Sequence, residues 1–159
     1  MKTFKVGIVG TGNAAESHFN SLIKNNLFKV KSVCGKNSSR LRNRRKKWNV
    51  NIYSDTSEMV ISEKLDIVLI CNENKFHYLE AIKAVKAGTH IVVEKPIDAD
   101  INNSKKLINL CKKNKKYLVV VMQKRYDSAT NYLKKLLRKN YLGNIVSVRV
   151  EIFMHRYVV

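Results

Sequence analysis

Near its start the chain contains Phe4-Lys5-Val6-Gly7-Ile8-Val9, followed directly by Gly10-Thr11-Gly12-Asn13-Ala14-Ala15. The first run is apolar enough to predict a buried strand. In the second run, Gly10 permits a sharp turn off the strand, and Gly12 lets the backbone approach a pyrophosphate. Ala15 is small enough for the next helix to pack closely on the sheet, and Asn13 belongs to the same turn. Because such a helix begins with free N–H groups and a partial positive charge, the pattern predicts a dinucleotide-binding turn.

Beyond this turn, apolar runs alternate regularly with segments of helical periodicity. Strands are predicted at 4–9, 28–34, 51–53, 67–71, 90–93 and 117–122, and helices at 14–25, 39–48, 56–62, 76–87 and 100–113. Some strands are apolar throughout, as in Ile67-Val68-Leu69-Ile70, which is typical of a parallel sheet covered by helices on both faces. We therefore predict an α/β fold, a doubly wound parallel sheet of the Rossmann type. Ser38 or Ser39 is expected to cap the second helix.

The pattern changes after Gln123. Residues 127–139 predict an amphipathic helix, and apolar residues then alternate along a predicted strand: Val146, Val148, Val150, Ile152 and Met154. We predict a dinucleotide-binding domain over residues 1–123 and, over residues 124–159, the first helix and strand of an α+β substrate or oligomerisation domain. An apolar-faced strand without a neighbour favours association, so a homo-oligomer formed through this strand is expected.

The formal net charge of +19 at pH 7 needs an explanation, because such a charge can indicate nucleic-acid binding. The densest basic stretch is Arg40–Lys47, and other lysines occur in pairs on predicted helices. A general bias towards Lys, Asn and Ile accounts for much of this charge without any partner. Nucleic acid is therefore not an expected ligand.

The sequence gives no sign of a metal site or a membrane segment. Cys34, Cys71 and Cys111 lie far apart, without the spacing of metal ligands, and are expected to be reduced and mostly buried. No apolar run approaches the ~20 residues that span a bilayer, and residues 1–3 lead into a strand and not into a signal peptide. These features predict a cytoplasmic protein with no metal ion.

Four short motifs, in this order and spacing, resemble the Gfo/Idh/MocA oxidoreductases. They are Gly10-x-Gly12-x-x-Ala15 with His18, Asn74-x-x-His77, Glu94-Lys95-Pro96 and Gln123-x-Arg125-Tyr126. The resemblance implies the NAD(P)-binding part of a dehydrogenase that acts on a hydroxyl of a sugar. Residues 122–125, 143–145 and 154–156 look most like members that act on nucleotide-linked sugars.

Two alternatives to a sugar dehydrogenase stay open. One is an oxidoreductase that acts on a non-sugar substrate, and the other is a nucleotide-binding regulatory module without catalysis. In the family, a large second domain contributes a His, and often an Asp, beside the substrate. Those residues would lie beyond Val159, so the chain by itself is expected to bind cofactor without turnover.

The same resemblance implies roles for residues at the ends of the later strands. Lys95 is the expected catalytic residue: kept neutral by burial and by an adjacent cationic ring, it can take the hydroxyl proton as hydride leaves carbon. Glu94 either orients Lys95 or sits in a polar pair, and His18 is expected to be a packing residue. The other residues expected at the cofactor are Asn74, His77, Gln123 and Arg125. The alternatives are that His77 caps the next helix and that Arg125 forms an interdomain salt bridge.

The end of the second predicted strand departs from the family pattern. Many members carry an Asp there that binds the adenosine ribose, but residues 34–40 contain no acidic residue. The residues that could instead hold a 2′-phosphate are Lys36, Ser38, Ser39 and Arg40. The cofactor is therefore expected to be NADP or NAD, with NADP slightly favoured. The alternative is that these cations belong to the general basic excess and point into solvent. In a second departure, Glu73 stands where members commonly have Pro.

Overall fold

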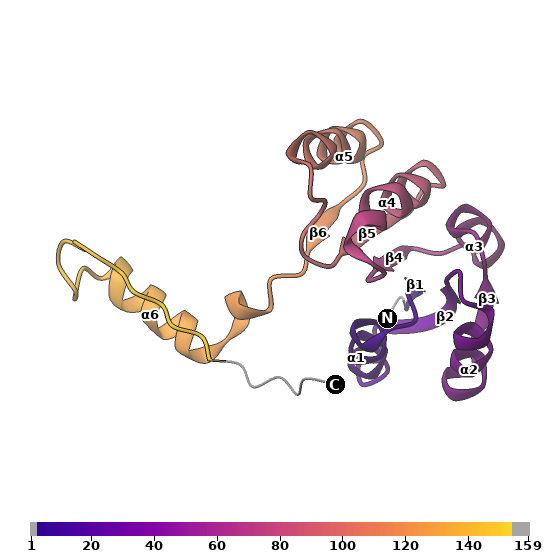
Figure 1. Cartoon of the computed structure of the whole chain (residues 1–159), viewed down its shortest axis with the longest axis horizontal. Coiled ribbons are helices and arrows are strands. Elements are labelled where there is room, and N and C mark those ends of the chain that lie inside the picture. The colour runs from indigo at the N-terminus through magenta and orange to yellow at the C-terminus, as the bar shows by residue number, and fades with distance from the viewer. Residues whose placement is uncertain (1–2, 154–159) are drawn as a thin grey trace. The chain divides into compact units, whose positions relative to one another are not determined.

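The computed structural model describes residues 3–153 and divides the chain into two compact units (Figure 1). The first unit ends at Val121 and the second begins at Met122.

The first unit is a parallel sheet with helices between its strands. The strands are β1 (Phe4–Val9), β2 (Phe28–Cys34), β3 (Asn51–Tyr53), β4 (Ile67–Ile70), β5 (His90–Val93) and β6 (Leu118–Val120). The helices are α1 (Asn13–Leu22), α2 (Ser38–Trp48), α3 (Thr56–Glu63), the 3₁₀-helix η1 (Asn74–Phe76), α4 (His77–Lys86) and α5 (Ile101–Lys113). The six strands lie in the order β3-β2-β1-β4-β5-β6, and all neighbouring strands pair in parallel. The predicted doubly wound α/β sheet is confirmed.

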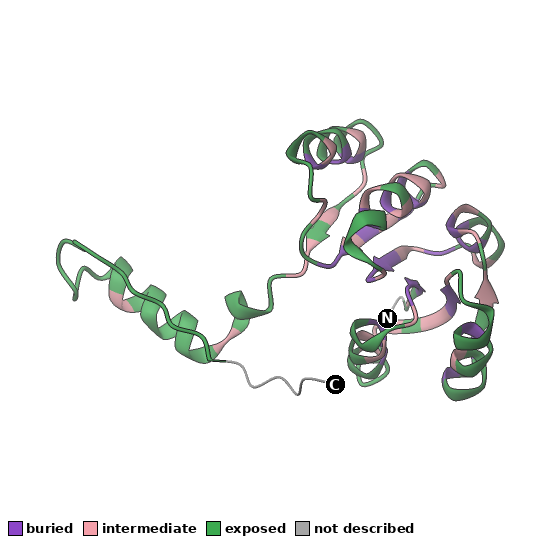
Figure 2. Ribbon diagram, viewed as in Figure 1, coloured by how far each residue is buried: buried purple, intermediate pink, exposed green. Residues whose placement is uncertain are grey.

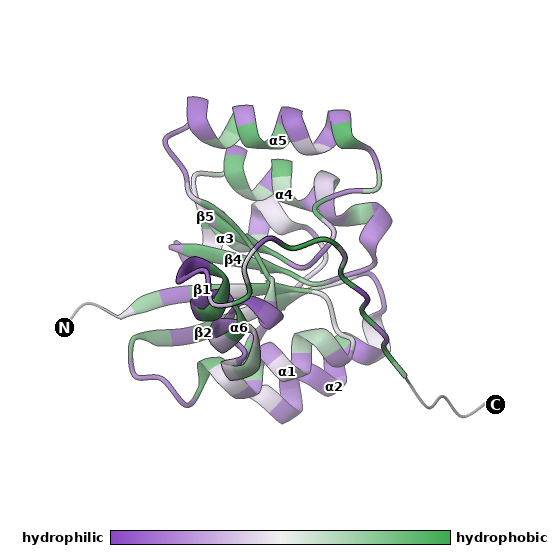
Figure 3. Cartoon of the chain, turned by 90° about the vertical axis from the view of Figure 1, so that its left-hand side faces the viewer, coloured by the Kyte–Doolittle hydropathy of each residue, from purple (hydrophilic) through white to green (hydrophobic). Residues whose placement is uncertain are grey.

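Both faces of the sheet are covered by helices, because the strands carry apolar side chains on both faces and these must be kept from water. Helices α1 and α2 lie on one face, and α3, α4 and α5 lie on the other (Figure 3). Successive residues of β1 belong to opposite layers: Ile8 belongs to the cluster that contains Phe19 and Trp48, and Val9 to the cluster that contains Met59. The direction of winding reverses between β1 and β4, so the loops that follow these two strands diverge and leave a crevice.

The start of α2 differs from the sequence prediction. Asn37, and neither Ser38 nor Ser39, is the N-cap, and its side-chain oxygen accepts a hydrogen bond of 2.9 Å from the Arg40 amide. Asn, Asp and Ser are about equally good N-caps, so composition alone could not choose among neighbouring candidates. The helix therefore begins one residue earlier than predicted.

The second unit contains η2 (Gln123–Tyr126) and α6 (Ser128–Arg138), and α6 buries none of its residues (Figure 2). The predicted strand near residues 146–154 is wrong for the part that the structure describes: residues 145–153 form no strand and lie exposed. A strand requires a hydrogen-bonding neighbour, and this unit supplies none within its described residues. Met154 and the motif residues 155–156 lie outside the described range.

No helix in residues 3–153 combines the length and the apolar character needed to cross a membrane.

Candidate functional site

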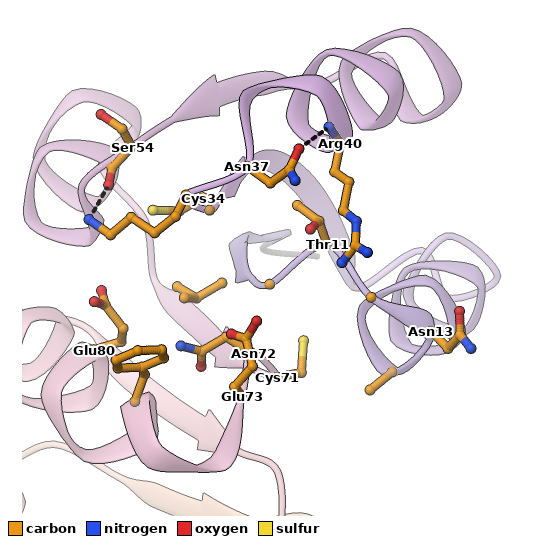
Figure 4. Close-up of a pocket in the computed structure, with 17 residues that line it drawn as sticks. Thr11, Asn13, Cys34, Asn37, Arg40, Ser54, Cys71, Asn72, Glu73 and Glu80 are labelled. Atoms are coloured by element: carbon orange, nitrogen blue, oxygen red, sulfur yellow. Dashed lines mark hydrogen bonds between the residues drawn. The ribbon is translucent and has the colours of Figure 1, made fainter.

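A cavity of about 510 Å³ opens at the carboxyl ends of β1, β2 and β4, where the winding of the sheet reverses (Figure 4). Ligands of open α/β sheets bind at such a position, and the volume lies within the range of small-molecule sites. The lining residues are Val9, Gly10, Thr11, Gly12, Asn13, Ala14, Cys34, Gly35, Lys36, Asn37, Arg40, Ser54, Cys71, Asn72, Glu73, Phe76 and Glu80.

Gly10 makes the turn that brings the chain from β1 to this cavity. Its φ of +123° lies in a region that residues with side chains rarely adopt. A Cβ atom at this position would lie 2.6 Å from the Cys71 carbonyl oxygen, and the Gly10 amide donates a hydrogen bond of 2.9 Å to the Cys34 carbonyl. The turn therefore fits closely between the ends of β2 and β4, and only glycine can occupy it.

Gly12 plays a different part, because its backbone is unstrained and an added Cβ atom would meet no atom within 4 Å. It is the N-cap of α1 and provides no side-chain cap. The amide N–H groups of Gly12, Asn13 and Ala14 donate no hydrogen bond to any of the described residues. Ala15, in contrast, is a fully buried residue of α1 that packs in the core and does not line the cavity. The helix start thus presents unpaired donors and positive partial charge to the cavity, as an anion-binding site requires.

The loop after β2 forms the second wall. Of the four residues expected at the 2′-phosphate, Lys36 and Arg40 line the cavity, whereas Ser38 and Ser39 do not. The Lys36 ammonium donates a hydrogen bond of 3.2 Å to the Ser54 carbonyl, and the Arg40 guanidinium has no hydrogen bond or ion pair among the described residues (Figure 4). Arg40 is therefore the cation at this wall that is free to meet a ligand.

The third wall comes from the loop after β4 and from α4, and sequence reasoning missed most of it. The side-chain oxygen of Asn72 is buried and has no hydrogen-bond partner among the described residues. Glu80 also lines the cavity, and its Oε2 accepts a hydrogen bond of 2.5 Å from the Thr56 hydroxyl. The predicted Asn74 lies in η1, outside the lining. A buried acceptor without a donor is costly, so Asn72 is a polar group of this wall that the described residues leave unsatisfied.

Two buried thiols lie at the floor of the cavity. Burial raises the pKa of Cys34 to about 11 and that of Cys71 to about 12. Both cysteines are therefore neutral at physiological pH and cannot act as nucleophiles or thiolate ligands.

The carboxyl end of β5 carries the motif that contains the predicted catalytic lysine. The Glu94 carboxylate is buried, accepts a hydrogen bond from the Lys95 amide, and lies 2.7 Å from Nε2 of His18. Lys95 is exposed, its side chain has no hydrogen bond or ion pair in the described part of the chain, and the Lys95–Pro96 peptide is cis. Of the two readings of Glu94, the polar pair is present, and its partner is His18.

His77 is buried at the start of α4 and links two loops. Its Nδ1 lies 2.7 Å from the Pro96 carbonyl oxygen, and its Nε2 lies 3.0 Å from the Asn72 carbonyl oxygen. It does not line the cavity. His77 thus joins the loop of Lys95 to the loop of Asn72, so one buried side chain connects the expected catalytic residue to a wall of the cavity.

Gln123 and Arg125 lie on η2 in the second unit, so they do not belong to the unit that contains the cavity. The residues that line the cavity all come from the first unit, among them the glycine turn, Lys36, Arg40 and Asn72.

Comparison with known proteins agrees with this geometry. The family model described as "Oxidoreductase family, NAD-binding Rossmann fold" matches residues 4–122, which span the sheet and the whole cavity. The chain belongs to this family, Gfo/Idh/MocA. The resemblance seen in the four motifs is thereby confirmed.

Individual members of the Gfo/Idh/MocA family match at low identity and over part of their length. D-glucoside 3-dehydrogenase of Escherichia coli is 27% identical over 143 residues, which cover 89% of this chain and 41% of that protein. The crystal structure of scyllo-inositol dehydrogenase from Lactobacillus casei, with bound NAD(H) and scyllo-inositol, superposes with a TM-score of 0.83 at 26% identity, covering 90% of this chain and 43% of that one. The chain thus spans less than half the length of these relatives.

The solved structures that this chain resembles hold either cofactor. Biliverdin reductase from Synechocystis, solved with biliverdin and NADP⁺, is 26% identical with a TM-score of 0.77, covering 86% of this chain and 43% of that one. Since the L. casei enzyme was solved with NAD(H), similarity to these structures leaves the choice between NAD and NADP open.

Proposed function

We propose that this chain is the cofactor domain of an NAD(P)-dependent dehydrogenase that oxidises a hydroxyl of a sugar or nucleotide-linked sugar. The observation that carries the proposal is the start of α1 at the cavity, where the N–H groups of Gly12, Asn13 and Ala14 have no acceptor among the described residues. A dinucleotide fits this arrangement, because its pyrophosphate accepts hydrogen bonds and carries negative charge. The match of residues 4–122 to an NAD-binding family supports the same assignment.

Direct titration tests cofactor binding. We expect the 159-residue chain to bind NAD(H) or NADP(H) with a dissociation constant in the micromolar range, measured by isothermal titration calorimetry. Variant Gly12→Val should abolish this binding, since its side chain would fill the space beside the unpaired N–H groups. A folded wild-type chain that binds neither cofactor at millimolar concentration would contradict the proposal.

Local charges favour NADP in this proposal. Arg40 lines the cavity with no partner of its own among the described residues, and the loop from β2 to α2 lacks a carboxylate that would repel a 2′-phosphate. Glu73 and Glu80 line the opposite wall and oppose this effect, so the preference should be modest. One charge-assisted contact corresponds to roughly a tenfold preference.

The preference is tested with a matched pair of arginine variants. Arg40→Gln should reduce the NADP/NAD affinity ratio to near one, whereas Arg42→Gln, an exposed arginine outside the cavity lining, should leave the ratio unchanged. The titrations are run both at low salt and at ~0.3 M salt. At the higher concentration, salt screens the non-specific attraction of the phosphates to the net charge of +19. Equal affinities for both cofactors in the wild type would argue against a 2′-phosphate site.

Lys95 is the proposed base of the complete protein. Oxidation of an alcohol releases a hydride to the nicotinamide ring and a proton from the hydroxyl, and the amine form of Lys95 would take that proton. The Lys95 side chain is exposed, so the burial expected from the sequence is not supplied by the described part of the chain. Its place at the carboxyl end of β5, beside the buried Glu94 that accepts a hydrogen bond from its amide, supports the role.

In the complete protein, Lys95→Ala should lower kcat by at least 100-fold while cofactor affinity stays unchanged. Lys86→Ala, which removes an exposed lysine at the end of α4, serves as the control and should keep full activity. Undiminished turnover in Lys95→Ala would assign the proton transfer to another group. The same assay on a panel of sugars, nucleotide-linked sugars and cyclic polyols separates a sugar dehydrogenase from an oxidoreductase on other substrates. The chain of 159 residues alone should bind cofactor without turnover.

A further inference from the structure

Arg44 of α2 reaches the glycine turn that binds the cofactor, although it does not line the main cavity. Its Nε and Nη2 atoms donate hydrogen bonds of 3.1 and 3.0 Å to the carbonyl oxygen of Thr11. Its Nη1 atom donates a bond of 2.6 Å to Glu16 of α1. One guanidinium thus holds the second residue of the turn and the first turn of the helix that follows it.

The position of Arg44 is itself tightly determined. The guanidinium carbon lies 4.8 Å from the ring centroid of Trp48, one helical turn further along α2. That ring stacks on Phe19 of α1 with centroids 4.4 Å apart and planes inclined by 6°. Lys47 forms a second ion pair with Glu16. The Arg44 side chain is only 13% exposed, so it has little freedom to leave the Thr11 carbonyl.

The hydrogen bonds to Thr11 determine the orientation of the peptide that follows. In a trans peptide the carbonyl oxygen and the next N–H point in opposite directions, so an oxygen turned towards Arg44 turns the Gly12 N–H away from it. Arg44 lines a second, polar hollow next to the main cavity, and Gly12 borders both. The side of Gly12 that faces away from Arg44 is therefore the main cavity.

We propose that Arg44 is a positioning residue for the phosphate site: it holds the Thr11–Gly12 peptide so that the Gly12 N–H donates to the cofactor pyrophosphate. This inference rests on the proposed binding of NAD(P). Arg44 itself does not bind the phosphate, because its guanidinium is already engaged by Thr11 and Glu16, and the Glu16 carboxylate offsets its charge.

The role depends on the planar fork of arginine and not on its charge. Lysine keeps the charge but offers a single nitrogen, which cannot reproduce two bonds to Thr11 and one to Glu16. Arg44→Lys is therefore the informative variant. Arg45→Lys is the matched control, since Arg45 is exposed on the same helix and makes no hydrogen bond or ion pair among the described residues.

The test compares ADP, which carries the pyrophosphate, with adenosine, which carries no phosphate, by calorimetric titration of the 159-residue chain. Loss of one well-placed hydrogen bond predicts an affinity for ADP about tenfold weaker in Arg44→Lys, with adenosine affinity unchanged. Arg45→Lys should match the wild type with both ligands. Arg44→Lys that also matches the wild type, or that weakens ADP and adenosine equally, overturns the inference.

A measurement on the wild type keeps the inference testable if Arg44→Lys does not fold. In an ¹⁵N–¹H spectrum, the Gly12 amide should move strongly downfield on addition of ADP and stay in place on addition of adenosine. An unmoved Gly12 signal with ADP bound overturns the role of Arg44 while leaving cofactor binding intact. A wild-type chain that binds neither NAD(H) nor NADP(H) would overturn the proposed function, and this inference with it.

Discussion

Gly10 and Gly12 share a motif, but the structure requires glycine at these two positions for different physical reasons. Gly10 combines a φ of +123° with backbone atoms of Cys71 at contact distance, so the folded state itself needs glycine. Gly12 has ordinary backbone angles and open space beside it, so only a ligand needs the absence of a side chain there. Stability and binding can therefore be separated within one turn.

Alanine substitutions at the two glycines should differ in their effects, one mainly on stability and the other mainly on cofactor binding. Gly10→Ala should destabilise the fold by about 2–3 kcal/mol, because it adds backbone strain and a clash with the Cys71 carbonyl. Gly12→Ala should change the free energy of unfolding by less than ~0.5 kcal/mol and weaken cofactor binding about tenfold. Urea denaturation and cofactor titration of both variants give the comparison. Equal destabilisation by both variants would show that Gly10 and Gly12 are not required for different reasons.

The buried cysteines predict low thiol reactivity and an alkaline loss of stability. Cys34 and Cys71 should react with a disulfide reagent at pH 8 at least 100-fold more slowly in the native than in the urea-unfolded chain. Because burial raises the pKa of Cys34 from 9.0 to about 11, its contribution to stability is complete below pH 9 and is lost as the pH rises towards 11. Cys34→Ala should remove that part of the pH dependence. Rapid native labelling would contradict the burial.

At the scale of elements, side-chain caps decide where helices begin. Asn37, Asp55, Asp100 and Asp127 each accept hydrogen bonds from amides of the first turn of α2, α3, α5 and α6. The α3 cap is reinforced from outside its helix, since the Asp55 carboxylate also lies 3.2 Å from the Lys83 ammonium of α4. Helix α3 therefore has both a local and a tertiary reason to start at Thr56.

Replacing the α3 cap should cost about 1 kcal/mol in Asp55→Ala and clearly less in Asp55→Asn, which still accepts hydrogen bonds. The bond from the Glu58 amide and the nearby Lys83 lower the pKa of Asp55. Its contribution is therefore present above the unfolded-state value near 3.8 and lost as the pH falls below it. Urea denaturation at pH 7 and pH 3 should show a smaller alanine deficit at pH 3 than at pH 7. A deficit of equal size at both pH values would mean that the charge of Asp55 adds nothing to the cap.

At the scale of the whole molecule, the two units differ in how far their apolar residues are buried. The first unit buries them in two layers on either side of the sheet. The second unit leaves them exposed on α6 and beyond it: Tyr132, Leu133, Leu137, Val146, Val148, Val150 and Ile152. Exposed apolar surface on this scale is typical of a surface that meets another chain or segment.

This exposure predicts self-association through the second unit. At ~0.3 M salt, where repulsion from the net charge of +19 is screened, the 159-residue chain should run as a dimer or larger in light scattering. A chain that ends at Val121 should be monomeric and still bind cofactor, because the cavity lies wholly within it. Val148→Asp combined with Ile152→Asp should shift the full-length chain towards monomer. A strict monomer for the unmodified chain would contradict this prediction.

The sequence by itself determined the alternation of strands and helices, the parallel sheet and the glycine turn. These depend on residues that are neighbours in the chain, where side-chain periodicity and turn chemistry act directly. The nearby Lys36 and Arg40 could be placed for the same reason. Prediction was less successful where the outcome depended on a partner: the strand expected near residue 146 has no neighbouring strand to bond within residues 3–153.

Only the tertiary structure decided which distant side chains meet at the site. Asn72 was missed because nothing in its local pattern shows that its side-chain oxygen is buried without a donor. Glu80 reaches the cavity from α4, and Arg44 bonds to Thr11 across 33 residues of chain, from a helix that otherwise appears as a solvated basic segment. Such contacts depend on how helices pack against one sheet and on which residue of each turn faces inward. Those relations are set by the close packing of the core, to which all the strands and helices contribute together.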